Sequence, residues 1–193
     1  MCGAPSFERS ARGFANDLSR LLTRTVTYQP LVCDFVGDGN VVLIRFRPEH
    51  RYVELGNGSF ISVLQRVVPD PEAVSGIRIA AYSYSYALGP NPDEDWLVRY
   101  DYVPEMAARP DYPYPASHVH INATSEPYEA FAEASGRRRP LSQVHFPTGC
   151  IGIEDLIEHL IVEFDVPVLY GRSKEEALGI LAESRRLRER RIR

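Results

Sequence analysis

The sequence predicts an α+β fold, in which a mainly antiparallel β-sheet packs against helices near both ends of the chain. Three observations lead to this prediction. An amphipathic pattern occupies residues 6–23, a β-rich texture with turn signals occupies residues 25–122, and helical patterns return over residues 152–193. No helical period separates the predicted strands, which favours hairpins over a parallel sheet. A chain of 193 residues can bury a sizeable core, so we expect a single domain over residues 1–193.

The first helix and the strands follow from the spacing of apolar residues and of turn signals. Residues 6–23 place apolar side chains at helical spacing with charged residues between them: Phe7, Phe14, Leu18, Leu21 and Leu22. The turn signals "GDGN", "GNGS", "PDPEAVSG" and "GPNPDED" then divide the β-rich region. With the later strands included, we expect a sheet of five to seven strands, with the first helix and a helix at 152–164 on one face.

A row of tyrosines is expected in the middle of the β-rich region. In "AAYSYSYAL", Tyr82, Tyr84 and Tyr86 alternate with alanine and serine, so the three rings share one face of a strand. Such a row packs against a helix or a neighbouring strand in one interpretation. In the other interpretation it is an aromatic platform on which nucleic-acid bases stack.

The second half of the chain reads as an irregular link followed by helices. A proline-rich link, "PEMAARPDYPYPAS", leads to the strand "HVHINA", because proline cannot donate to a β ladder. We expect a helix at 125–135, a strand at 141–146 and an amphipathic helix at 152–164. The stripe of that last helix should be buried: Ile153, Leu156, Ile157, Leu160, Ile161 and Phe164.

The chain ends in a basic helix. Ser173 and Glu176 form a capping-box pattern at its start, and residues 185–193 contain six arginines. Arginines at a helix C-terminus also complement the helix dipole, so a solvated helix end explains them without any partner. We expect these arginines to be exposed and available to RNA or an acidic partner, and we expect their deletion to leave the melting temperature nearly unchanged.

Composition restricts the environment in which the protein works. The formal net charge of −4 provides no global attraction to nucleic acid, so such binding has to be local. The three cysteines form no CxxC pair, which is typical of free thiols in a reducing compartment. No apolar run approaches the ~18 residues that a membrane span needs, and the N-terminus lacks the apolar core of a signal peptide. We expect a cytoplasmic protein without a membrane partner.

Two histidines in "HVHINA" are the first candidates for chemistry. In a strand His118 and His120 project to one face, while Val119 and Ile121 supply apolar contacts on the other. Neighbouring imidazoles suit acid–base catalysis or divalent metal ligation, and His145 on another predicted strand is a possible third ligand. The alternative is a structural pair. Because the core positions are already filled, we expect the two histidines to be exposed and dispensable for folding.

The strand "LVRYDYV" adds a charged pair. Alternation places Arg99 and Asp101 on one face, with Tyr100 and Tyr102 on the other. A carboxylate orients an imidazole by accepting its N–H, and an arginine holds a phosphate with two hydrogen bonds. The set therefore suits cleavage of a phosphodiester bond in RNA or a nucleotide. The alternative is a cross-strand Arg–Asp pair on a solvated face.

Standard motifs for other reactions are absent. There is no GxxxxGK[ST] phosphate loop, no GxGxxG before a helix, no HExxH and no GxSxG. A cupin is a distant alternative, because Glu126 follows the HxH pair but lies in a predicted helix. His159, on the polar flank of its helix, and His50, in a turn-like segment, are expected at the surface.

The order of segments over residues 50–122 resembles the TumE-like toxins of bacterial toxin–antitoxin pairs. The matching segments are "YVELGNGSFISVLQRVV", "YSYSYAL", "WLVRYDYVP" and the proline-rich approach to "HVH". The resemblance matches Arg99 and Asp101 to the family's Arg-x-Asp, and His118 and His120 to the end of its histidine cluster. It departs after the aspartate, where this chain reads "YVPEM", and the terminal helices are extra.

Two classes of function follow. In the first, the protein is a toxin-like enzyme, an RNase or phosphodiesterase-type hydrolase, restrained by a helix-turn-helix type antitoxin. Its catalytic residues are His118, His120, Asp101 and Arg99. In the second, it is a non-enzymatic metal-binding or protein-interaction domain. A divalent metal ion bound by His118, His120 and His145 is compatible with both.

Overall fold

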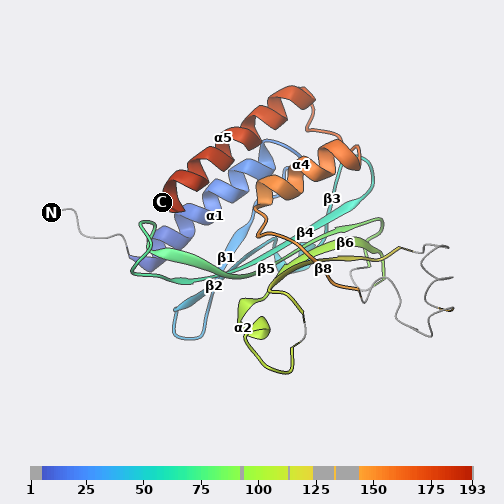
Figure 1. Cartoon of the computed structure of the whole chain (residues 1–193). Coiled ribbons are helices and arrows are strands. Elements are labelled where there is room, and N and C mark those ends of the chain that lie inside the picture. The colour runs from blue at the N-terminus through green and yellow to red at the C-terminus, as the bar shows by residue number, and fades with distance from the viewer. Residues whose placement is uncertain (1–5, 92–93, 113, 124–132, 134–143, 193) are drawn as a thin grey trace.

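The chain folds into one antiparallel β-sheet with helices layered over one of its faces (Figure 1). The computed structural model describes residues 6–91, 94–112, 114–123, 133 and 144–192. The strands are β1 (Val32–Val36), β2 (Val41–Arg45), β3 (Val53–Glu54), β4 (Phe60–Pro69), β5 (Ile77–Ala87), β6 (Trp96–Tyr102), β7 (Ser117–Ile121) and β8 (Phe146–Pro147). The helices are α1 (Phe7–Thr23), α2 (Pro104–Ala107), α4 (Ile153–Glu163) and α5 (Lys174–Ile192), with a 3₁₀ turn η1 at Pro48–His50. The predicted α+β class is thus confirmed.

The strands pair in the order β1-β2-β4-β5-β6-β7-β8, and β3 pairs with β4. Every pair among the described strands is antiparallel, as the turn signals predict. Gly37 and Gly39, with φ of 65° and 85°, supply the left-handed backbone at the turn between β1 and β2. The eight described strands exceed the predicted five to seven, because β3 and β8 are only two residues long. Strands this short leave no alternation to detect in the sequence.

Helices α1, α4 and α5 cover one face of the sheet, and the single turn α2 lies on the other side (Figure 1). Helix α1 begins after Ser6, whose side chain accepts a hydrogen bond from the N–H of Arg9, as expected of an N-cap. Ser173 and Glu176 exchange the hydrogen bonds of the predicted capping box at α5. None of these helices, over their described residues, is long and apolar enough to cross a membrane.

The tyrosine row belongs to the hydrophobic core. Tyr82, Tyr84 and Tyr86 are at most 5% exposed and face the helices. The rings of Tyr82 and Tyr84 stack with centroids 4.5 Å apart, and Tyr86 contacts Phe164 at 4.8 Å. The packing interpretation is therefore confirmed, and the base-stacking platform is wrong because the rings are not accessible.

Two expectations for the second half of the chain fall partly outside the described residues. Of the predicted helix at 125–135, only Glu133 is described, and it is helical. Of the predicted strand at 141–146, residues 144–146 are described, and Phe146 begins β8. The stripe on α4 is confirmed from Ile153 to Ile161, while Phe164 ends the helix and is half-buried.

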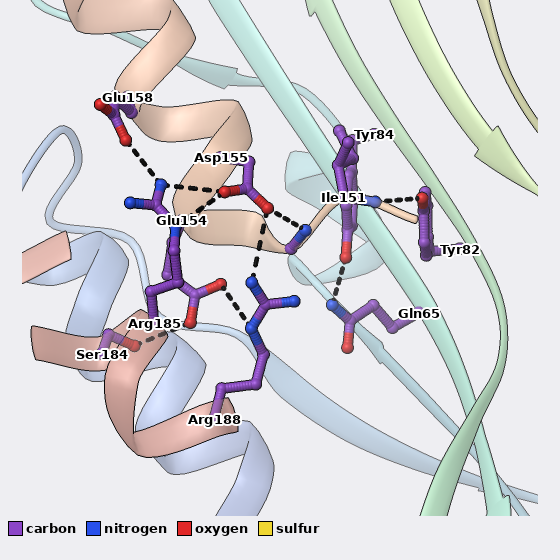
Figure 2. Close-up of polar contacts among 11 residues, drawn as sticks. Gln65, Tyr82, Tyr84, Ile151, Glu154, Asp155, Glu158, Ser184, Arg185 and Arg188 are labelled. Atoms are coloured by element: carbon purple, nitrogen blue, oxygen red, sulfur yellow. Dashed lines mark hydrogen bonds and ion pairs between the residues drawn. The ribbon is translucent and has the colours of Figure 1, made fainter. Parts of the chain in front are cut away.

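The expectation of a freely exposed arginine tail is wrong for the arginines that pack on α4. Arg185 donates to Asp155 and Glu158, and Arg188 lies 3.5 Å from both Glu154 and Asp155 (Figure 2). The side chains of Arg185 and Arg188 are 30% and 29% exposed. The acidic residues of α4, which the sequence pattern places on its polar side, thus form ion pairs with the arginines of α5.

We expect Leu160→Ala to lower the free energy of unfolding by about 2–5 kcal/mol, because it leaves a cavity in the core. Leu160 is 1% exposed, whereas Val162 on the same helix is 41% exposed. The matched control, Val162→Ala, should change the free energy by no more than about 0.5 kcal/mol. Urea denaturation measures both. Equal losses would contradict the orientation of α4.

We expect Arg185→Ala to destabilise the protein by on the order of 1 kcal/mol, because it removes the contacts to Asp155 and Glu158. Arg186, which is exposed, provides the control. Thermal unfolding of Arg185→Ala and Arg186→Ala tests the contrast. If the two variants melt at the same temperature, the ion pairs between α4 and α5 contribute nothing measurable.

Candidate functional site

Two neighbouring strands carry the four residues singled out as catalytic candidates. In the pairing of β6 with β7, Asp101 lies opposite His118 and Arg99 lies opposite His120. Residues directly opposite each other on antiparallel strands point to the same face. Tyr100 contacts α4, so the side chains on either side of it point away from the helices. The register thus gathers all four candidates on the sheet face opposite α1, α4 and α5.

His145 joins the histidine pair from the segment before β8. The pairing of His118 with Pro147 brings this segment alongside β7. The ring centroid of His145 lies 4.8 Å from that of His118 and 4.2 Å from that of His120. One ligating nitrogen from each of the three rings lies within 4.8 Å of the others. The predicted convergence of three imidazoles is therefore confirmed.

The histidine pair is buried, which corrects the expectation of exposed imidazoles. His118 is 2% exposed and His120 is 5% exposed. Tyr114, from the proline-rich link, stacks on His145 with centroids 3.5 Å apart, and Trp96 meets the edge of His120 at 6.4 Å. This second layer of aromatic rings covers the pair. Replacing His118 or His120 consequently removes packing contacts.

Hydrogen bonds orient both buried imidazoles. Nδ1 of His118 lies 2.8 Å from the carbonyl oxygen of Pro115, so Nδ1 carries the proton and Nε2 keeps its lone pair. Nε2 of His120 lies 3.4 Å from Asp101 Oδ2. Burial and the neighbouring His120 lower the pKa of His118, while the Pro115 carbonyl opposes this shift. A neutral imidazole is the form that ligates metal ions.

Asp101 is the junction of the polar contacts. Its Oδ2 accepts a hydrogen bond from Arg99 Nε at 2.9 Å and lies beside His120. Burial raises the pKa of Asp101, but hydrogen bonds from His120 and Ser83 and the charge of Arg99 outweigh it and hold the pKa below its usual value. The carboxylate is therefore ionised when it orients the imidazole.

Arg99 lies at the more open side of the cluster. Its side chain is 37% exposed, and its guanidinium carbon lies 5.2 Å from the centre of the Trp96 ring. The Arg99–Asp101 pair joins two residues of one strand. It is thus not the cross-strand pair that the sequence left as an alternative. Its Asp101 partner is only 14% exposed at the side chain, so the pair does not lie on a solvated face.

Sequence reasoning missed three neighbours of the site: Ser83, Trp96 and Tyr114. Ser83 pairs with Asp101 across β5 and β6, so the serines between the core tyrosines were the available signal. Trp96 begins the strand that carries Arg99, and alternation alone does not position its ring. Tyr114 lies in the proline-rich link, whose path over the histidines depends on tertiary contacts.

Two other histidines lie outside this cluster. His50 is exposed, as predicted. His159 is half-buried and contacts Tyr100 and Phe164 edge-on, so it packs between α4 and the sheet more deeply than a surface residue. Glu126, the glutamate of the cupin alternative, lies outside the described residues.

Comparisons with protein-family models, with curated proteins and with solved structures each give no match to this chain. The resemblance to TumE-like toxins therefore stays a prediction, and no relative supplies roles for the site residues. Inference about function has to start from the geometry of the cluster.

We expect the chain to bind one Co²⁺ or Zn²⁺ ion at the three histidines. Metal content after dialysis and the visible absorption of Co²⁺ measure this binding. His120→Ala should abolish it, and Asp101→Asn should weaken affinity by about 10–100-fold, because the amide orients the His120 ring less well.

The control for the metal experiment is His50→Ala, which changes a histidine exposed in a 3₁₀ turn. It should bind the ion like the parent. Circular dichroism establishes that each variant is folded. Full binding by folded His120→Ala would contradict the assignment of the ligands.

Proposed function

We propose that the protein is a metal-dependent hydrolase that cleaves phosphodiester bonds in RNA. One observation carries the proposal: the buried imidazoles of His118 and His120 and the partly buried imidazole of His145 converge beside a carboxylate and an arginine. Three protein ligands leave a coordination position for a water or a substrate, as in catalytic zinc sites. The proposal therefore names both a cofactor, a divalent metal ion, and a reaction, phosphodiester hydrolysis.

The donor set fits a divalent transition metal. Imidazole nitrogens suit zinc and its neighbours, and they lie about 2.0–2.1 Å from a bound zinc ion. Ligand atoms within 4.8 Å of one another reach such an ion by small rotations of the side chains. The second nitrogens of His118 and His120 face a backbone carbonyl and a carboxylate, which is the usual support of metal-bound histidine. When bound, the ion supplies Lewis acidity toward water and a phosphoryl oxygen.

The remaining residues act on the substrate side. Asp101 positions both His120 and Arg99 through its carboxylate. Arg99 uses Nε for that contact, so its terminal nitrogens suit a phosphate oxygen. The exposure of Arg99, compared with the buried histidines, supports approach of the phosphate from the side of Trp96. Direct acid–base catalysis by His118 fits less well, because a ring that is 2% exposed meets few atoms of a polymer.

A non-enzymatic metal centre is the second candidate. The burial of His118 and His120 favours it, because structural metal sites are closed to solvent. In that case the ion would join β7 to the segment before β8. The two functions differ in their response to loss of Arg99, which is needed for phosphate binding and not for holding the metal.

The biological setting follows the resemblance to TumE-like toxins. An RNase of this kind inhibits growth in the cytoplasm, where its substrate is, and a helix-turn-helix type antitoxin restrains it. If a small helix-turn-helix gene lies beside this one, growth after induction with and without that gene tests this part of the proposal separately from the chemistry.

We expect the purified, metal-loaded protein to cleave a fluorescently labelled single-stranded RNA. A chelator should abolish cleavage and Zn²⁺ should restore it. Arg99→Ala should reduce the cleavage rate by about 10²–10³-fold, the range seen when a charge-stabilising donor is lost, while metal content stays the same. Arg45 on β2 is also 37% exposed and also pairs with an aspartate, Asp34 on β1, so Arg45→Ala provides the control variant.

Several outcomes would contradict the proposed reaction. Cleavage that persists in the presence of chelator would show that the reaction needs no metal. Cleavage at the parental rate by Arg99→Ala would remove the phosphate-binding role. A metal-loaded protein that cleaves no RNA would favour the structural metal centre.

A further inference from the structure

The helix-covered face of the sheet contains a cavity that the proposed function does not use. Its volume is about 1260 Å³, and it lies between α1, α5 and the strands β4 and β5. Apolar side chains form much of its wall: Phe14, Leu18, Ile77, Ile79, Ile180 and Leu187. The histidine cluster lies on the opposite face, so this space is a separate site.

Buried polar side chains are among the residues that line this cavity, and Figure 2 shows the contacts between them. Gln65 and Tyr84 on the sheet are 1% and 0% exposed, and Gln65 Nε2 donates to the Tyr84 hydroxyl oxygen at 2.5 Å. Glu154 on α4 is 2% exposed and accepts a hydrogen bond from Ser184 of α5 at 2.9 Å. Arg188 reaches in from α5. Apolar walls with a few polar side chains are typical of a small-molecule site.

Three of these buried polar atoms have no hydrogen-bond partner within the described part of the chain. They are the acceptors Gln65 Oε1 and Glu154 Oε2 and the donor Arg188 Nε. Arg188 Nε and Glu154 Oε2 are 3.5 Å apart, too far for a good hydrogen bond. Leaving buried polar atoms unpaired is costly, so native proteins nearly always satisfy them with protein, water or ligand. Gln65 Oε1 needs a donor, whereas Arg188 Nε and Glu154 Oε2 face each other as a long ion pair, into which an inserted polar group would bring a closer partner for each atom.

We propose that this cavity binds a neutral amphiphile that has an amide head group and an apolar chain. An amide N–H can donate to Gln65 or Glu154, and the amide carbonyl oxygen can accept from Arg188. One head group therefore supplies both the donor and the acceptor. The head is neutral because Glu154, the buried carboxylate of the cavity, already faces Arg188, and a further buried charge would stay uncompensated. The chain lies against the apolar wall formed by α1, α5 and β5.

The test uses octanamide, which has both features, and methyl octanoate, which has a matched chain and an acceptor but no N–H donor. Calorimetric titration of the full chain should show saturable binding of one octanamide, and the melting temperature should rise. Methyl octanoate should bind at least about tenfold more weakly, because it leaves Gln65 Oε1 unpaired.

A pair of matched variants locates the head group. Gln65→Leu should weaken octanamide binding by about tenfold, whereas Gln29→Leu, at an exposed position between α1 and β1, should leave it unchanged. In NMR spectra, octanamide should shift signals of Leu18, Ile79 and Ile180 and leave those of the metal-ligand histidines in place.

Three results would overturn the proposal. Absence of saturable binding would mean that the cavity holds only water. Equal affinity for octanamide and methyl octanoate would show that the amide N–H makes no hydrogen bond in the cavity. Because this comparison uses the parent protein, it remains valid even if Gln65→Leu fails to fold. Parental affinity in folded Gln65→Leu would place the head group elsewhere.

Discussion

The register of β5, β6 and β7 is the constraint on which the rest of the structure depends. One row across these strands contains Ser83, Asp101 and His118 in direct opposition, and the next row contains Ser85, Arg99 and His120. Because side chains alternate with a period of two, both rows point away from the helices. A slip of one residue in either pairing would move charged groups under α4 and core residues into the site.

Two different requirements are met by the two faces of the same strands. The helix face is filled by the stacked Tyr82 and Tyr84 and by the stripe of α4, so it stabilises the fold through burial of apolar surface. The other face is polar, and its groups are paired through Asp101. A buried imidazole beside a largely buried carboxylate is stabilised because Asp101 contacts the His120 ring and pairs with Arg99.

The proline-rich link between β6 and β7 covers part of the sheet face that lies opposite the helices, where the three histidines are. It leaves β6 through α2 and returns to β7, with the N–H of Val103 bonded to the carbonyl of Ala116. On the way it delivers Tyr114 to His145 and the Pro115 carbonyl to His118. Proline fixes its own φ, which helps to hold the Pro115 carbonyl where it accepts a hydrogen bond from Nδ1 of His118. The segment between β6 and β7 therefore orients His118 and covers His145.

The sequence by itself determined the longer elements and the faces of those elements. Periods of 3.6 and 2 are local properties, which is why α1, the stripe of α4, the tyrosine row and the shared face of Arg99 and Asp101 were all predictable. Only the tertiary structure decided the burial of His118, the pairing of Arg185 with α4 and the neighbours Ser83 and Tyr114 of the site. Burial and ion pairing depend on which segments meet across long separations, and no local pattern encodes that choice.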